Sequence, residues 1–343
     1  MKKKWSAALQ IAAVYVGTVV GAGFATGKEI VEFFTQYGFI GLVGILFSGY
    51  LFILLGSRMM VISANINATS YQELNTYLFG KTAAKFINIF MLVMLLLVCS
   101  VMLSGSGAVF SEQLLLSKHI GIFITIGLTI FFLLFDSKGI FIVNTFAVPI
   151  MISFSFLLLL FSITQPHFVE QALFIPPTDY GYKAVIAPFS YAALNLALAS
   201  AVLVPIASEV KDIPTIKLGA KLGGLFLTMI MVASHLTLIM LPNVTEYSIP
   251  MATIMKQSIQ FLFWIYILVI FAEILTSVIG NVFGLQRQIS QYIKWPKIVI
   301  CLIIISFCSL LSLVEYKTLL SILYPILGYL SIIFLVLLWQ KKV

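Results

Sequence analysis

The stretch Tyr15-Val-Gly-Thr-Val-Val-Gly-Ala-Gly-Phe-Ala-Thr-Gly-Lys-Glu29 carries four glycines within eleven residues of an apolar segment: Gly17, Gly21, Gly23 and Gly27. Glycine costs about 1 kcal/mol relative to alanine in a helix interior. Four glycines at one depth therefore predict a backbone that leaves the helical path. Non-helical backbone at membrane depth is tolerated only where it lines a cavity or is buried in protein. We therefore predict a binding site at this break.

The composition is that of a polytopic membrane protein. The 343 residues are 61% hydrophobic and 9% charged, whereas ordinary domains carry about 25% charged residues. The apolar runs are continuous and about 20 residues long, as in membrane helices, which excludes a transmembrane β-barrel. The net charge of +8 reflects basic loops and does not indicate a nucleic-acid partner. The three cysteines lie in apolar runs and form no disulfide framework or metal motif.

Ten apolar segments predict an all-α fold with ten transmembrane helices in one transporter domain, residues 1–343. The segments are 5–35, 39–63, 84–114, 119–135, 140–163, 184–209, 215–241, 258–286, 297–314 and 318–340. Short interfacial helices are expected at Ser70–Phe79 and around Ile249–Gln257. The lysine-rich start imitates a signal peptide, but its cleavage would discard the first half of the glycine segment.

The Lys and Arg distribution predicts a multi-pass protein of the plasma membrane with both termini in the cytoplasm. In that orientation, 15 of the 20 Lys and Arg residues lie inside and 5 outside. The longest polar connection, 164–183, separates two pseudo-repeats of five segments, 5–163 and 184–340. Because five is odd, the second half is expected upside down relative to the first. Inverted repeats of this kind are characteristic of secondary transporters.

The sixth segment echoes the first. It also runs from a tyrosine, Tyr191, through small residues to an acid, Glu209. Asn195 and Pro205 are expected to disturb its helix, so helices 1 and 6 are both predicted to be interrupted. Interrupted segments in corresponding positions of two halves indicate a transporter binding site.

Together these features resemble the LeuT-type fold of the amino acid–polyamine–organocation superfamily. The segment Gly17-Thr-Val-Val-Gly-Ala-Gly23 is similar to the glycine-rich first-helix motif of those transporters. Over its full length the chain also resembles the YkvI-like group of bacterial amino-acid permeases. The match is closer in the first segment than in the sixth.

The resemblance implies a substrate site between the two interruptions. A half-helix that begins near Gly21 presents unpaired N–H groups and a positive dipole end, which suits a carboxylate. By resemblance, the N–H groups of Ala22 and Gly23 hold the substrate's carboxylate. The ammonium group then faces carbonyls of Val19, Leu194, Asn195 and Ala197, and Ser104 lines the cavity. The alternatives are close Gly-x-x-x-Gly helix packing and a dinucleotide fingerprint, which needs a βαβ unit.

The eighth segment carries an acid, Glu273, near its middle. An intramembrane acid is a functional candidate by default because it is costly without water or a partner. By resemblance, an Na⁺ site comprises Gly17, Val20, Glu273, Thr276 and Ser277, and oxygen ligands suit such a hard cation. H⁺ carried by Glu273 is the alternative. A structural acid and hydroxyls bonded to their own backbone are the non-functional interpretations.

Two further acids, Glu29 and Glu32, follow the break and are expected to face an outer vestibule, where Lys28 pairs with Glu32 at helical spacing.

The expected function is symport of a small zwitterion, an amino acid, by alternating access. The expected partners are this solute and the bilayer, with no cofactor beyond the coupling ion, Na⁺ or H⁺. A channel or a non-transporting receptor on the same scaffold is the first alternative. An enzyme is disfavoured because the sequence shows no Ser/His/Asp set and no His-Glu-x-x-His helix.

Overall fold

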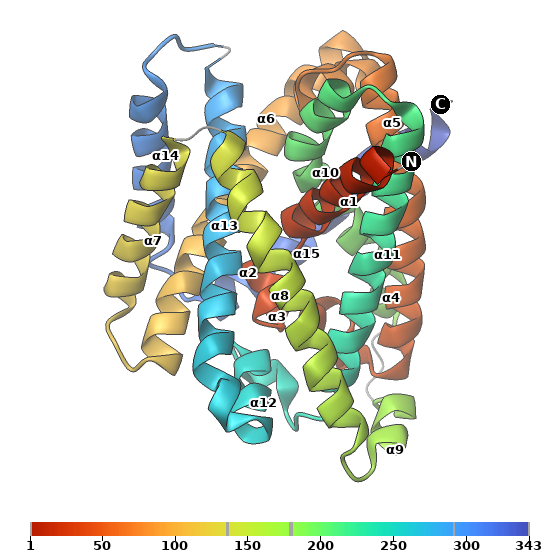
Figure 1. The fold of residues 1–343 in the computed structure, drawn as a ribbon, viewed down its shortest axis with the longest axis vertical. Coiled ribbons are helices and arrows are strands. Elements are labelled where there is room, and N and C mark those ends of the chain that lie inside the picture. The colour runs from red at the N-terminus through yellow and green to blue at the C-terminus, as the bar shows by residue number, and fades with distance from the viewer. Residues whose placement is uncertain (1, 135–136, 178–180, 291, 342–343) are drawn as a thin grey trace.

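The computed structural model describes residues 2–134, 137–177, 181–290 and 292–341, with the backbone alone for 2–3 and 137–147. The described chain is helical, with both of its ends at one end of the bundle and α9 and α12 at the other (Figure 1). In chain order the α-helices are α1 (Lys2–Val19), α2 (Ala22–Ala25), α3 (Lys28–Phe33), α4 (Phe39–Leu51), α5 (Ser57–Asn65), α6 (Tyr71–Ala108), α7 (Lys118–Leu133), α8 (Ser137–Ile163), α9 (Phe168–Leu173), α10 (Tyr182–Val210), α11 (Ile213–Leu238), α12 (Pro250–Ser258), α13 (Phe263–Ile289), α14 (Lys297–Leu311) and α15 (Tyr316–Gln340). Single 3₁₀ or π turns lie at Thr35–Tyr37, Phe52–Gly56, Val109–Gln113, Val244–Glu246 and Gln260–Leu262.

The prediction of an all-α polytopic membrane protein is confirmed. Six described segments are long and apolar enough to cross a membrane: Phe39–Asn65, Tyr71–Gln113, Tyr182–Val210, Ile213–Leu238, Gln260–Ile289 and Tyr316–Gln340. Large apolar side chains such as Phe47, Phe123 and Phe307 are exposed on the outside, as suits contact with lipid tails. Each of the ten predicted segments coincides with helical structure, while the number of crossings and the inverted repeat stay predictions.

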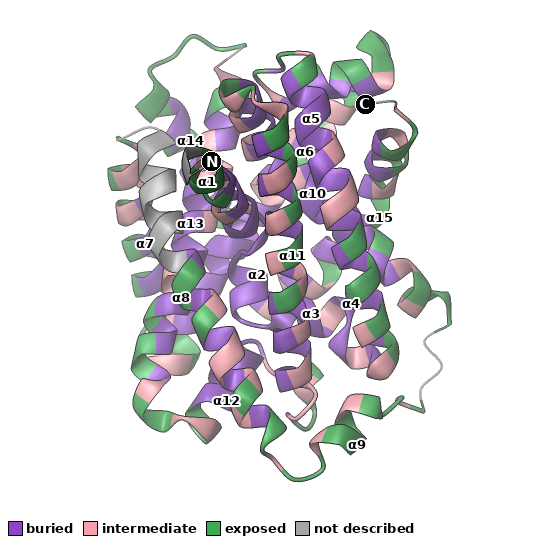
Figure 2. Ribbon diagram, turned by 45° about the vertical axis from the view of Figure 1, so that its right-hand side comes forward, coloured by how far each residue is buried: buried purple, intermediate pink, exposed green. Residues whose placement is uncertain are grey.

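The first apolar segment is broken twice, as its glycines predict. α1 ends at Val19, and Gly21 is extended, with φ −117° and ψ −167°, before α2 begins. Gly27 then turns the chain into α3 with φ +82°. A Cβ at Gly27 would lie 2.5 Å from Met251 Cγ, so this turn needs glycine for both its conformation and its space. The short helices α2 and α3 lie in the buried centre of the bundle (Figure 2).

The sixth apolar segment is not broken, and the prediction that helix 6 is interrupted is wrong for this structure. α10 runs continuously from Tyr182 to Val210 with Pro188 and Pro205 inside it. The side chain of Asn195 donates to the Tyr191 carbonyl one turn earlier, at 3.0 Å, and so does not disturb the helix. The surrounding residues are mainly alanine and leucine, which have high helix propensities.

Helices are present in both regions where interfacial helices were predicted, while their location at the membrane interface stays a prediction. Ser70 caps the start of α6, where its hydroxyl accepts from Glu73 N at 3.4 Å. Gly80, with φ +78°, then kinks α6 and separates its first turns from the long apolar part. α12 covers the second predicted region and lies at the end of the bundle opposite the termini (Figure 1).

Candidate functional site

A small cavity of about 50 Å³ lies at the break in the first segment. Its wall is formed by Gly17, Thr18, Val19, Gly21, Glu29, Val98, Met102, Asn195, Leu198, Ala201, Val202, Thr276, Ser277, Gly280, Asn281 and Tyr324. These residues come from α1 and its break, α3, α6, α10, α13 and α15. A water molecule needs roughly 10–15 Å³ on this measure, so the cavity has room for a few water molecules.

The α1 side of the cavity exposes unpaired backbone. Within the described chain, no backbone N–H donates to the carbonyls of Gly17, Thr18, Val19 or Val20. Buried carbonyls are almost always paired in folded proteins. The break therefore presents acceptors for a polar ligand, and Val19, which the sequence assigned to the substrate, lies in the cavity wall.

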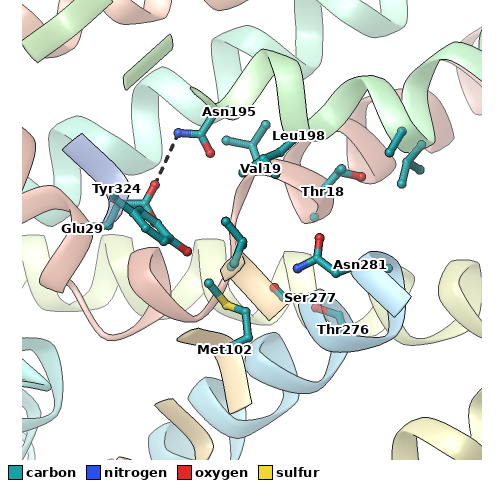
Figure 3. Close-up of a pocket in the computed structure, with 16 residues that line it drawn as sticks. Thr18, Val19, Glu29, Met102, Asn195, Leu198, Thr276, Ser277, Asn281 and Tyr324 are labelled. Carbon is teal, nitrogen blue, oxygen red and sulfur yellow. Dashed lines mark hydrogen bonds between the residues drawn. The ribbon is translucent and has the colours of Figure 1, made fainter. Parts of the chain in front are cut away.

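Glu29 is the acid of this cavity, and the described lining holds no Lys, Arg or His. The side chain is 2% exposed, and its Oε1 accepts from Asn195 Nδ2 at 3.3 Å. Tyr324 lies next to it (Figure 3). The turn at Gly27 directs α3 back into the protein, so the expectation that Glu29 faces an outer vestibule is wrong. The sequence showed an acid close after the predicted break, but not the turn that directs it into the cavity.

The two N–H groups assigned to a substrate carboxylate have protein neighbours in this structure. The N–H of Ala22 donates to Met102 Sδ at 3.3 Å. A Cβ at Gly23 would lie 2.5 Å from Glu29 Oε2, so the protein's own carboxylate sits directly beside this residue. Neither Ala22 nor Gly23 belongs to the cavity wall. The start of α2 therefore offers no free place for a second carboxylate in this conformation.

Three other predicted substrate residues lie away from the cavity. Leu194 and Ala197 are buried inside the unbroken α10, so their carbonyls are not freed by an interruption. The Ser104 hydroxyl donates to the Val314 carbonyl at 2.7 Å and lines a separate cavity with Glu112. Of the predicted residues on α6 and α10, only Asn195 faces the site at the break.

The predicted ion-binding residues meet only in part. Gly17, Thr276 and Ser277 line the cavity, whereas Val20 and Glu273 do not. The hydroxyls of Thr276 and Ser277 both donate to the Glu273 carbonyl, each at 2.9 Å. That carbonyl is therefore occupied, as in the interpretation of hydroxyls bonded to their own backbone. Within the described residues, no cluster of three or more His, Cys, Asp or Glu side chains could hold a metal.

The Glu273 side chain is wholly buried on α13, one turn before Ser277. Neither of its carboxyl oxygens has a hydrogen-bond partner in the described chain. Buried polar groups are normally hydrogen-bonded, and an intramembrane acid is a functional candidate. This acid is thus separate from Glu29, which has an amide partner and faces the cavity.

The cavity is sealed on the α12 side. Thr26 and Tyr316 share a hydroxyl–hydroxyl hydrogen bond of 2.9 Å, and the N–H of Met251 donates to the Thr26 carbonyl at 3.0 Å. The wholly buried Lys28 pairs with Glu32 at 3.1 Å and donates to the Thr245 carbonyl at 2.8 Å. We call these contacts the α12-side seal. Val202 and Asn281 line the cavity towards the other end, where the termini lie.

The comparisons with known proteins agree with a membrane protein. No protein-family model matches the chain. The chain is 46% identical over 342 residues to the membrane protein YkvI of Bacillus subtilis, covering 100% of this chain and 98% of the relative. It is 26% identical over 333 residues to YyaD of the same organism, covering 97% and 96%.

Among solved structures, a manganese transporter from Eremococcus coleocola matches with a TM-score of 0.63 at 14% identity, over 98% of this chain and 79% of that one. The same transporter bound to an aromatic bis-isothiourea compound matches with a TM-score of 0.60. This likeness shows a shared fold and carries no information on the substrate. The sequence relationship is closer, and by it the chain belongs to the family of the Bacillus subtilis membrane protein YkvI.

Proposed function

We propose that this protein is a secondary active transporter that moves a small amino acid or related amine by alternating access. The observation that carries the proposal is the double break in the first segment, beside a cavity that is walled by α6, α10 and α13 and contains several polar side chains. Irregular backbone at membrane depth marks a site that is buried in protein or lines a cavity, and broken helices of this kind build transporter sites. The fold shared with a manganese transporter supports the proposal.

Within this proposal, the α12-side seal is the closed outer gate of the cycle. The Lys and Arg distribution favours a cytoplasmic location for the termini, which puts α12 and the α12-side seal on the outside. The seal closes the outer path through Thr26–Tyr316 and Lys28–Glu32. Transport then requires these contacts to part while the inner path closes around Val202 and Asn281.

We propose H⁺ as the coupling ion, carried by Glu273. Neither of its carboxyl oxygens has a hydrogen-bond partner in the described chain. In the alternative Na⁺ site, the Glu273 carbonyl already accepts from the hydroxyls of Thr276 and Ser277. This leaves the carbonyls of Gly17 and Val20 as the backbone acceptors of that site that are unpaired among the described residues. An unpaired ionised acid inside a membrane protein costs much more free energy than the same acid in its neutral form. Loading and release of a proton at Glu273 would therefore change the relative stability of the inward-facing and outward-facing states. Coupling requires such a difference.

The test is uptake into proteoliposomes that contain the purified full-length protein. A panel of labelled amino acids and small amines is offered under a pH gradient alone and under an Na⁺ gradient alone. We expect saturable accumulation under the pH gradient. Accumulation driven by an Na⁺ gradient alone would mean that the coupling ion is Na⁺ and not H⁺. Flux without saturation or accumulation would indicate a channel.

Substitution of Glu273 tests the coupling step. Glu273→Gln keeps the shape and removes the titrating group, so gradient-driven accumulation is expected to fall at least about tenfold while facilitated exchange persists. Glu246→Gln is the matched control, because Glu246 is exposed at the α12 end, outside the cavity. Unchanged accumulation and pH dependence in Glu273→Gln would remove this residue from the mechanism.

A further inference from the structure

We infer that Glu29 and Asn195 form the recognition site for the cationic nitrogen of the solute, so that the substrate must carry an ammonium group. The inference rests on the proposed function and names the feature by which the site selects its solute. It departs from recognition by backbone carbonyls of two interrupted helices, because one of these helices is intact and a carboxylate occupies the cavity instead.

The charge balance of the cavity is the first observation. Its described wall contains one acid, Glu29, and no basic side chain. The nearest cation along the chain, Lys28, is directed elsewhere, because its Nζ pairs with Glu32 and donates to the Thr245 carbonyl. A buried carboxylate in its ionised form is strongly disfavoured without a cation. A solute with an ammonium group supplies the missing positive charge.

The geometry of the carboxylate is the second observation. Asn195 donates to Oε1 and is itself fixed by the Tyr191 carbonyl on the rigid α10. The carboxylate is thereby held at a defined place in the wall, next to Tyr324 (Figure 3). An N⁺–H donor from the solute would make charge-assisted hydrogen bonds there, which are about twice as strong as neutral ones.

The opposite wall is neutral and polar. Thr276, Ser277 and Asn281 of α13 lie across the cavity from Glu29 in Figure 3. The amide of Asn281 can donate to the rest of the solute, including a carboxylate if one is present, away from Glu29. The hydroxyl oxygens of Thr276 and Ser277, whose hydrogens are directed to the Glu273 carbonyl, can accept from the solute. A solute with a carboxylate and no ammonium group would instead meet the like charge of Glu29. The site therefore accepts cations and zwitterions and rejects simple anions.

The experiment compares solutes that differ only in their charged groups. Ethylamine, alanine and propionate share a two-carbon frame and carry an ammonium group, both groups, or a carboxylate alone; isobutylamine, valine and isovalerate form a second, branched set. Thermal stabilisation of the purified full-length protein is measured with each compound. We expect stabilisation by at least one ammonium compound and none by either simple anion. Stabilisation by the anions, or by no compound with an ammonium group, overturns the inference.

Variants then assign the effect to Glu29. Removing one partner of a buried charge pair lowers the binding affinity strongly. Glu29→Gln should therefore weaken the binding of the stabilising compound by about thirtyfold or more. Glu29→Asp keeps the charge and should retain part of the affinity, and Glu246→Gln should match the wild type. Wild-type affinity in Glu29→Gln contradicts the assignment. If Glu29→Gln fails to fold, Asn195→Leu, which frees the carboxylate, must show reduced affinity for the inference to stand.

The recognition site and the proposed transport can be refuted independently by these experiments. Stabilisation by ammonium compounds without uptake into proteoliposomes would refute the proposed transporter and leave the recognition site intact. Saturable uptake of a solute that lacks an ammonium group would support the proposed transporter and refute the recognition site.

Discussion

The first apolar segment and α10 have similar sequences and different structures. Both run from a tyrosine through small residues to an acid, yet the first breaks at Gly21 and Gly27 whereas α10 is one helix of 29 residues. The small residues are mainly glycine in the first segment and alanine in α10. Alanine favours the helix by about 1 kcal/mol per residue over glycine. The identity of the small residue thus decides which of the two segments opens.

The acids at the ends of the two segments, Glu29 and Glu209, also differ in their surroundings. The turn at Gly27 directs Glu29 into the centre of the bundle, where it meets Asn195. Glu209 continues its helix and remains exposed near the end of α10. The broken segment therefore supplies the charge of the site, and the intact helix supplies a rigid support for that charge.

Replacing the turn residue should have the largest effect on this contrast. In Gly27→Leu the left-handed backbone alone costs about 1–2 kcal/mol, and the new side chain meets Met251. We expect a lower midpoint of thermal unfolding and loss of solute binding, because Glu29 no longer reaches Asn195. Gly127→Ala on α7 is the control, since its Cβ would meet nothing within 4 Å. Intact binding in Gly27→Leu would show that the turn does not place the acid.

The α12-side seal should respond next. Thr26→Val removes the hydrogen bonds of the hydroxyl to Tyr316 and to the Gly23 carbonyl, and unpaired buried groups cost about 1–3 kcal/mol each. We expect the outer path to open more often, which raises solute exchange measured as counterflow in proteoliposomes. Thr253→Val on α12, a part-buried hydroxyl outside the seal, should leave exchange unchanged. Equal exchange in Thr26→Val and the wild type would count against a gating role.

A change in α10 should have the smallest effect on transport. Pro205→Ala restores one helical hydrogen bond, and a proline inside a helix costs about 3 kcal/mol. We expect a higher midpoint of thermal unfolding and an uptake rate within about twofold of the wild type. A large loss of uptake in the more stable variant would mean that α10 bends during the cycle, and the contrast between the two segments would then describe one state only.

The features that could be predicted from the sequence are those that depend on residues close to one another in the chain. The glycine-rich break and the helices at Ser70–Phe79 and in α12 follow from propensities and capping residues near Gly21 and Ser70. The interruption that was predicted at Asn195 and Pro205 is wrong. The Asn195 amide bonds the previous turn, and the one hydrogen bond lost at Pro205 does not outweigh the helix propensity of the surrounding alanines and leucines. The position of Glu29 could not be predicted, because it depends on how one turn at Gly27 packs against Met251, which comes from a segment more than 200 residues away.

The separation of Ser104 from the site has a similar cause. Ser104 was expected to face the cavity at the break, but its hydroxyl donates to the Val314 carbonyl. Helical periodicity places a residue on a face of its helix and does not choose the neighbour that the face meets. Such assignments need the packing of α6 against the loop before α15.

Side-specific labelling of one cysteine tests alternating access at this cavity most directly. Cys99, Cys301 and Cys308 are buried and are first replaced by alanine or serine, and Leu198→Cys then places a thiol in the cavity wall. We expect a membrane-impermeant maleimide to label it from the side of the termini, and also from the opposite side when Thr26→Val weakens the seal. Labelling from neither side, or from one side only in both proteins, would contradict a cavity that opens alternately to the two faces of the membrane.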